Sequence, residues 1–166
     1  MDLLVSIGLE ETHTPLHIIL IRLVVAAALG ALIGLERGST SGVAGLRTHI
    51  LIALAAALFT TLTFEIYHAS LEFSPQQGAD PIRAVEAVTA GIAFLGAGAI
   101  FQQRGSVQGL TTGAGMWLAG AVGLSAALGY YIIAVAAALL AVLVLAAMRG
   151  FSHKVVSKGE ATPGGD

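Results

Sequence analysis

The charged side chains that could bind an ion or another protein are few, and three of them flank one short turn. Glu36 and Arg37 precede a turn rich in glycine and serine, and Arg47 follows it. The simplest interpretation is that the arginines hold this turn on one side of a membrane while Glu36 pairs with one of them. The alternative is that Glu36 attracts a cation or gates an entrance, with the guanidinium groups orienting it through forked hydrogen bonds.

A second group of charges, Arg22, Glu65, Arg83 and Glu86, falls inside apolar segments or at their edges. A lone charge at the centre of a bilayer costs at least ~2.5 kcal/mol on insertion scales, which favours pairing of Arg22 with Glu65 or Glu86. We therefore predict an internal layer of salt bridges, with a structural locking role and an ion-related role both open. Mg²⁺ prefers octahedral oxygen coordination with retained water, for which Glu65 and Glu86 are the conceivable carboxylates. The nearby arginines weaken such a site, and we assign no metal ligand.

Thr111 and Thr112 follow the short polar loop Gln102 to Gly109 and open an apolar segment. Their hydroxyls are expected to cap backbone N–H groups at the start of a helix. The alternative is that these hydroxyls or the N–H groups face a bound or conducted ion. Trp117 is expected to be a packed or lipid-facing aromatic. The histidines are scattered without metal-ligand spacing: His13, His17, His49, His68 and His153.

Enzymes and nucleic-acid-binding proteins are disfavoured as classes. The stretch Gly96-Ala97-Gly98 lacks the Lys-Ser/Thr of a phosphate loop and follows no predicted strand, and no serine and histidine constellation indicates hydrolysis. A net charge of -2 and the lack of a basic tract argue against nucleic acid. Without cysteine there is no thiol nucleophile, and no motif indicates a cofactor. We expect a protein that is not an enzyme.

The composition indicates a lipid environment for the elements that position these residues. The chain is 56% hydrophobic and 11% charged, with a mean hydropathy of +0.86. Apolar runs predict an all-α bundle of about five membrane-spanning helices within a domain of residues 16–148. The predicted spans are Leu16–Leu35, Leu46–Tyr67, Ile82–Phe101, Leu110–Gly123 and Ala127–Met148. Gly123, Gly129 and the pair Tyr130-Tyr131 mark the expected reversal between the last two.

Positive charge predicts the orientation of these spans. Six basic residues fall on one predicted side: Arg37, Arg47, Arg104, Arg149, Lys154 and Lys158. By the positive-inside rule that side is the cytoplasm, which places the N-terminus outside and the C-terminus inside. Residues 1–15 are then an external segment, and residues 149–166 a disordered cytoplasmic tail.

Glycine and alanine recur at four-residue intervals and predict close helix packing. One stripe comprises Ala26, Gly30, Gly34 and Gly38, and another Gly115, Ala119 and Gly123. A third dense stretch, residues 91–100, contains Gly91, Phe94, Gly96 and Gly98. Small residues let membrane helices approach closely. Packing within the bundle is the simplest interpretation, and a homo-oligomer interface is the alternative.

Several ordered motifs make the chain resemble the MgtC/SapB family over residues 18–148. They are Gly34-Leu35-Glu36-Arg37, Ala44-Gly45-Leu46-Arg47-Thr48, Asp80-Pro81-Ile82-Arg83, the stretch from Gly91 to Gly98, and Gly109-Leu110-Thr111-Thr112. Motifs in this order and at these separations are far more specific than a single glycine pattern.

The resemblance implies a multi-pass protein of the bacterial inner membrane, associated with adaptation to low magnesium and, in some pathogens, with survival in host phagocytes. Family members are proposed to affect magnesium or other ion transport. Some look like regulators that bind membrane partners such as the proton-translocating ATP synthase or a transporter. We expect the lipid bilayer as the constant partner and regulation of a membrane protein as the function. An ion transporter or transporter subunit is the alternative.

The chain departs from the family pattern in two places. Many relatives continue into a cytoplasmic domain resembling ACT modules, and we expect residues 149–166 to form a tail without such a domain. Ala93 replaces a usual glycine, and Gly113 and Gly115 fall where relatives often carry alanine. We expect these changes to redistribute the close helix packing.

Overall fold

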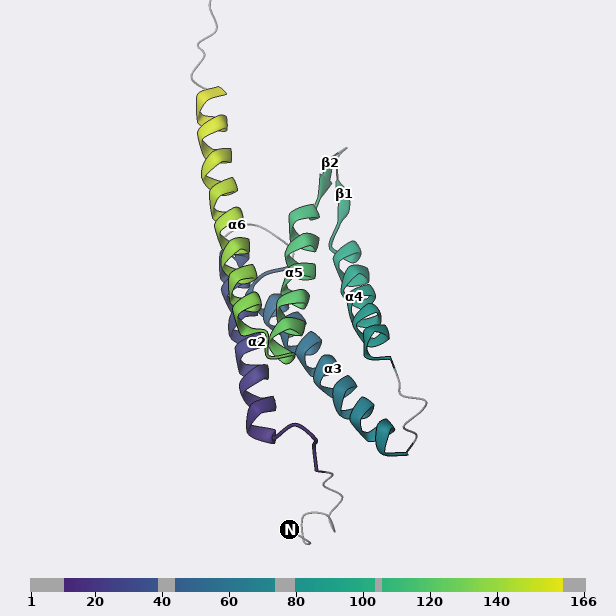
Figure 1. The fold of residues 1–166 in the computed structure, drawn as a ribbon. Helices are drawn as coiled ribbons and strands as arrows, with labels where there is room; N and C mark the ends of the chain where they lie inside the picture. Colours follow the sequence, from purple (N-terminus) through teal and green to yellow (C-terminus); the bar gives the residue numbers. More distant parts are fainter. Residues whose placement is uncertain (1–10, 39–43, 74–79, 104–105, 160–166) are drawn as a thin grey trace, which may run out of the picture.

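The computed structural model describes residues 11–38, 44–73, 80–103 and 106–159, which form five α-helices and a short β-hairpin (Figure 1). The helices are α2 (Leu16–Gly38), α3 (Leu46–Phe73), α4 (Pro81–Gly98), α5 (Leu110–Ala127) and α6 (Tyr131–Gly159). The predicted all-α, multi-pass bundle is confirmed. Three predicted helix starts, at Leu16, Leu46 and Leu110, coincide with the observed ones.

A hairpin replaces the predicted polar loop between α4 and α5. Its strands are β1 (Phe101–Gln103) and β2 (Ser106–Gln108), antiparallel with Phe101 opposite Gln108. The predicted extension of α4 to Phe101 is therefore wrong. Gly109 follows β2 with a φ of 87°, in the left-handed region that glycine adopts without strain. This residue turns the chain directly into α5.

Successive helices run in opposite directions, and α5 lies at the centre of the bundle (Figure 1). It contacts α2, α3, α4 and α6. The helices α2 and α3 pack closely at the end where α2 stops and spread apart toward the other end (Figure 1). At the edge of the bundle, α4 contacts α5 and α3. The buried residues of α4 are Ile92 and Gly96 alone.

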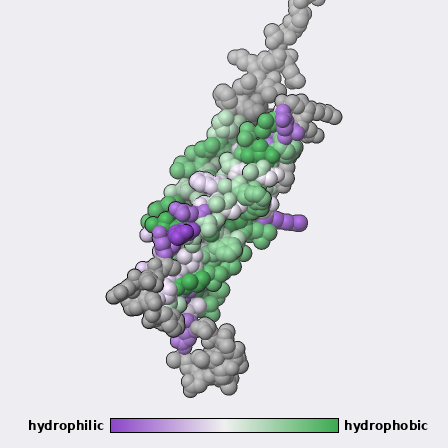
Figure 2. Space-filling model, turned by 90° about the vertical axis from the view of Figure 1, so that its right-hand side faces the viewer, coloured by the Kyte–Doolittle hydropathy of each residue, from purple (hydrophilic) through white to green (hydrophobic). Residues whose placement is uncertain are grey.

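The described surface is hydrophobic and the interior is built from small residues. Four of the described helices contain stretches long and apolar enough to cross a membrane: Leu16–Arg37, Leu46–Leu71, Leu110–Ala127 and Tyr131–Met148. Most of the described surface on the side of α4 is green, which marks hydrophobic residues (Figure 2). Most of the buried hydrophobic residues are alanines, whereas large aliphatic residues such as Ile132 and Leu143 are exposed. This distribution suits lipid as the solvent.

The reversal between α5 and α6 lies at Gly129, as one of the predicted markers indicated. Gly129 has a φ of 81°, its N–H donates to the Ala126 carbonyl at 3.0 Å, and the Tyr130 N–H donates to the Ser125 carbonyl at 2.9 Å. These two bonds form a Schellman motif, which ends α5. The predicted end of α5 at Gly123 is wrong, because Gly123 lies inside the helix against α3.

The end of α6 also differs from the prediction. The helix continues through Met148 to Gly159, so a disordered tail from residue 149 is wrong for residues 149–159. No proline interrupts this stretch, and Pro163 is the first that follows it. Residues 160–166 of the predicted tail, and residues 1–10 of the predicted N-terminal segment, lie outside the described residues.

The start of α2 and the end of α6 lie at opposite ends of the bundle (Figure 1). Arg37, at the end of α2, and Arg47, at the start of α3, share the end that carries the hairpin. Arg22 and Arg83 lie in the opposite half. Arg37 and Arg47 thus share one end as predicted, Arg104 lies outside the described residues, and the assignment of that end to the cytoplasm stays a prediction.

Candidate functional site

A buried polar site forms where α2, α3 and α5 meet, near the hairpin end. Arg37 lies in the last turn of α2, where a cation is favoured by the helix dipole. Its Nη2 donates a hydrogen bond of 2.6 Å to Oγ1 of Thr112 on α5, and Thr112 is 2% exposed. A charged donor makes this a strong hydrogen bond. It ties the end of α2 to the start of α5.

His49 of α3 completes this site and is fully buried. Its Nδ1 lies 2.9 Å from the Gly45 carbonyl oxygen. A carbonyl oxygen only accepts, so Nδ1 carries a proton, and in a neutral ring Nε2 would be the acceptor. Nε2 is buried and has no hydrogen-bond partner in the described structure. Sequence analysis missed His49, because spacing between histidines gave no signal; its position directly after Arg47-Thr48 in an apolar helix was the available hint.

Glycines on two neighbouring helices make room for His49. A Cβ at Gly30 of α2 would stand 2.7 Å from the His49 carbonyl oxygen, and one at Gly34 would stand 3.1 Å from the His49 Cβ. On α5, a Cβ at Gly115 would stand 3.1 Å from Nε2 and 3.9 Å from Cδ of Arg37. Gly30, Gly34 and Gly115, which belong to the two predicted small-residue stripes, therefore pack within the bundle around His49.

The prediction for the threonines is wrong. The residue that caps α5 is Gly109, with no side-chain hydrogen bond, and the two threonines lie inside the first turn. Thr112 accepts from Arg37, whereas Thr111 is exposed. The left-handed backbone at Gly109 starts the helix earlier than a threonine cap would. Trp117 is 52% exposed on the outer side of α5, as a lipid-facing aromatic would be.

The predicted internal layer of salt bridges is not formed among the described residues, and pairing of Arg22 with Glu65 or Glu86 is wrong. Glu65 instead accepts the backbone N–H groups of His13 at 2.6 Å and Thr14 at 3.1 Å. These groups precede α2 and have no helical partner of their own. Arg22 faces the turn between α5 and α6, where a Cβ at Gly129 would stand 3.2 Å from its Nη2.

Among the remaining predicted charges, Arg47 is exposed at the start of α3, and Glu36 is partly buried beside Arg37. Arg83 and Glu86 are exposed on α4, away from Glu65 and Arg22. No group of three or more metal-ligating side chains occurs among the described residues. The site at Arg37, His49 and Thr112 thus offers hydrogen-bond donors and one ring nitrogen beside a guanidinium group.

The glycines in the dense stretch of α4 have two kinds of surroundings, one packed against α5 and one open. Gly96 faces Gly113 of α5, where an added Cβ would meet the Gly113 carbonyl oxygen at 3.4 Å. A Cβ at Gly91 or Gly98 would meet nothing within 4 Å, and Phe94 between them is 78% exposed. Only one of the three glycines therefore serves packing within the described chain.

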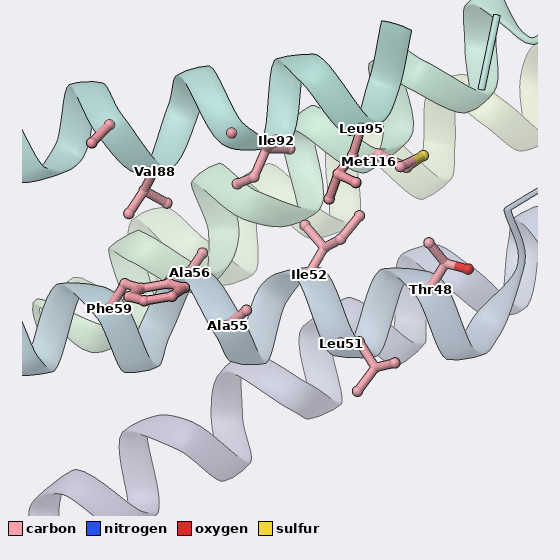
Figure 3. Close-up of a pocket in the computed structure, with 12 residues that line it drawn as sticks. Thr48, Leu51, Ile52, Ala55, Ala56, Phe59, Val88, Ile92, Leu95 and Met116 are labelled. Atoms are coloured by element: carbon pink, nitrogen blue, oxygen red, sulfur yellow. The ribbon is translucent and has the colours of Figure 1, made fainter. Parts of the chain in front are cut away.

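An apolar groove of about 720 Å³ lies between α3 and α4 (Figure 3). Met116 of α5 closes its floor, and Thr48 contributes the sole polar side chain of the lining. The other lining residues are Leu51, Ile52, Ala55, Ala56, Phe59, Ala87, Val88, Gly91, Ile92 and Leu95. Such a groove accepts apolar groups. Its described lining contains no ligand set for a cation.

Comparison with known proteins identifies a family and several relatives. The family model of the MgtC family matches residues 23–154. The chain is 33% identical over 139 residues to the "Putative magnesium transporter YhiD" of Escherichia coli (strain K12), covering 84% of this chain and 64% of that protein. It is 37% identical over 121 residues to "Protein MgtC" of Salmonella typhimurium (strain LT2), covering 73% and 48%. The chain thus spans about half to two thirds of these relatives, and no solved structure matches it.

Proposed function

The chain belongs to the MgtC family, and we propose that it regulates another protein of the cytoplasmic membrane during adaptation to low magnesium. Family membership and the helices of membrane-spanning length make it a multi-pass protein of the bacterial inner membrane. The proposed target is an ion-translocating complex such as ATP synthase or a transporter. We propose no catalysed reaction.

The observation that carries this proposal is the character of the buried polar site. Arg37 brings a positive charge into the junction of α2, α3 and α5, and its hydrogen bond to Thr112 fixes the helices there. Mg²⁺ would be repelled by the guanidinium group and would require oxygen ligands. A site of this kind holds helices in one arrangement so that the bundle can present a defined surface.

The carboxylates support the same conclusion. Glu65 is engaged by two backbone N–H groups at the end of the bundle opposite to Arg37. Glu86 is exposed on α4. A cation path would need carboxylates that converge on one cavity. In the described structure these two do not converge.

Magnesium transport is the second candidate, favoured by the name of the YhiD relative, "Putative magnesium transporter". The full chain in liposomes that enclose a magnesium-sensitive dye separates the two functions. We expect influx no faster than in protein-free liposomes. Influx that depends on the chain and is lost in Glu86→Gln, but kept in the control Glu11→Gln at an exposed position outside the helices, would overturn the regulatory proposal.

The regulatory function predicts a partner with altered activity. Crosslinking in native membranes of cells grown at low magnesium should attach the chain to one ion-translocating complex. Adding the purified chain to liposomes that hold this complex should then change its transport rate. Crosslinking without any change in rate would contradict regulation.

A further inference from the structure

The helix α4 turns a broad face away from the rest of the described fold, and this face consists mainly of small residues. Most of its exposed residues are small or charged: Arg83, Glu86, Ala87, Ala90, Gly91, Ala93, Ala97 and Gly98. The large exposed side chains of α4 are Ile82 in the first turn, Phe94, and Leu95, which lines the groove toward α3.

The charges of α4 set it apart from α5, which carries none. Two of the 18 residues of α4, Arg83 and Glu86, are charged. Its 18 residues are nevertheless ~27 Å long at ~1.5 Å per residue, close to the thickness of the hydrocarbon core. The helix is therefore long enough to cross a bilayer, with both charges in its first two turns.

The outer face of α6 provides the contrast. It is equally open, yet it carries large aliphatic side chains such as Ile132, Leu140 and Leu143, which are 87%, 60% and 63% exposed. Such side chains match lipid tails, whereas glycine and alanine are enriched where membrane helices touch. Exposure alone therefore does not distinguish the two helices, but the kind of residue exposed does.

Two charges on the face of α4 strengthen the contrast. Arg83 and Glu86 are both exposed, and no ion pair joins either of them to another described side chain. Arg83 also lies in the first turn, where the helix dipole disfavours a cation. Charges facing lipid are costly unless they find partners or reach the interface. On a second copy of α4, Glu86 offers an opposite charge to Arg83 of the first copy, and Arg83 offers one to Glu86.

The shape of the face is self-complementary as well. Phe94 projects from it, and glycines three residues before and four residues after leave open space on each side. Gly91 also lines the groove between α3 and α4. A projecting side chain beside hollows at these spacings is the pattern with which helices interlock.

We propose that α4 packs against α4 of a second copy in a parallel, two-fold symmetric dimer. Copies inserted in one orientation carry equivalent residues at equal depth, and a two-fold axis along the membrane normal makes every contact reciprocal. Arg83 of each copy then faces Glu86 of the second copy, offset by only ~4.5 Å along the helix. Phe94 of each copy lies in the hollow beside Gly91 of the other. This inference concerns assembly and goes beyond the proposed function.

Single cysteines test the dimer directly, because the natural chain has none. Ala90→Cys and Ala97→Cys place a thiol on the face of α4, and Leu140→Cys places one on the outer face of α6 as the matched control. Full-length variants in native membranes are treated with a mild oxidant. We expect a product of twice the chain mass from both α4 variants and not from the α6 variant. Equal products from all three, no product from α4, or a product with a different protein overturns the proposal.

Exchange of the charges supplies the second test, in the Ala90→Cys background. Arg83→Glu and Glu86→Arg should each lower the crosslinked fraction by about tenfold, the scale of a lost polar contact between membrane helices. The double exchange, Arg83→Glu with Glu86→Arg, should restore it because opposite charges again face each other. An unchanged crosslinked fraction in all three exchange variants would overturn the ion pairing. Liposome flux and partner regulation do not enter these readouts, so failure here is distinct from failure of the proposed function.

Discussion

Replacing Gly123 by alanine should destabilise the bundle more than any change on its outer surface. Gly123 of α5 lies directly against the backbone of Ala53 on α3. An added Cβ would overlap the Ala53 carbonyl oxygen and stand 2.8 Å from its carbonyl carbon and Cα. Ordinary contact begins near 3.4 Å, so the helices would have to separate by at least about 0.6 Å. The obstacle is backbone, which has no rotamer to yield.

The cost follows from the packing that such a separation disturbs. Overpacking of a tight interior costs about 1–3 kcal/mol, and a backbone obstacle places Gly123→Ala near the upper end of that range. Gly91→Ala is the matched control, because its Cβ meets nothing within 4 Å. There the gain in helix propensity, about 1 kcal/mol, should stabilise the monomer instead. The same substitution on two helices thus has opposite predicted signs.

The assay is equilibrium unfolding of the purified chain in mixed micelles under dilute, monomeric conditions. Helicity is followed by circular dichroism, and tertiary structure by the fluorescence of Trp117, the one tryptophan of the chain. We expect the midpoint of Gly123→Ala to fall and that of Gly91→Ala to rise relative to the natural chain. Equal stability of the natural chain and Gly123→Ala would refute the close approach of α3 and α5.

Three further substitutions test the buried site and the start of α5. His49→Leu should stabilise the chain by about 1 kcal/mol in the same assay, because it removes a buried nitrogen without a partner in the described structure. A clear loss of stability would show that this ring nitrogen does have a hydrogen-bond partner. Thr112→Val should cost about 1.5–3 kcal/mol by removing the acceptor of Arg37, while Thr111→Val at the exposed neighbour should be neutral. Gly109→Ala should cost at least about 1–2 kcal/mol because its φ is 87°, with faster amide hydrogen exchange in the first turn of α5; unchanged exchange would contradict this.

The His49→Leu variant also distinguishes a role of the ring in stability from a role in function, which the sequence did not suggest. A buried polar group that the fold does not need for stability is a candidate for a functional role. If His49→Leu is stable and still regulates the partner complex, the ring serves packing alone. A stable His49→Leu chain that no longer regulates would place the bare nitrogen in the mechanism.

The sequence by itself determined the environment and the five helices of the described residues, because these depend on local properties. The beginning of each apolar run correctly predicted the start of α2 at Leu16 and of α3 at Leu46. The reversal near Gly129 followed from the backbone freedom of glycine. The ends of α5 and α6 were less well determined, because no strong stop signal lies at Gly123 or directly after Met148.

Only the tertiary structure decided which faces meet. A sequence gives the spacing of residues along each helix, but the rotation of one helix against the next depends on contacts between distant segments. That rotation turns Arg22 toward Gly129 and leaves Glu65 to bind backbone N–H groups before α2. It also buries His49 among three glycines and leaves Gly91 open on α4. Similar residues therefore have different roles, since a side chain's role depends on what the neighbouring helix brings to it.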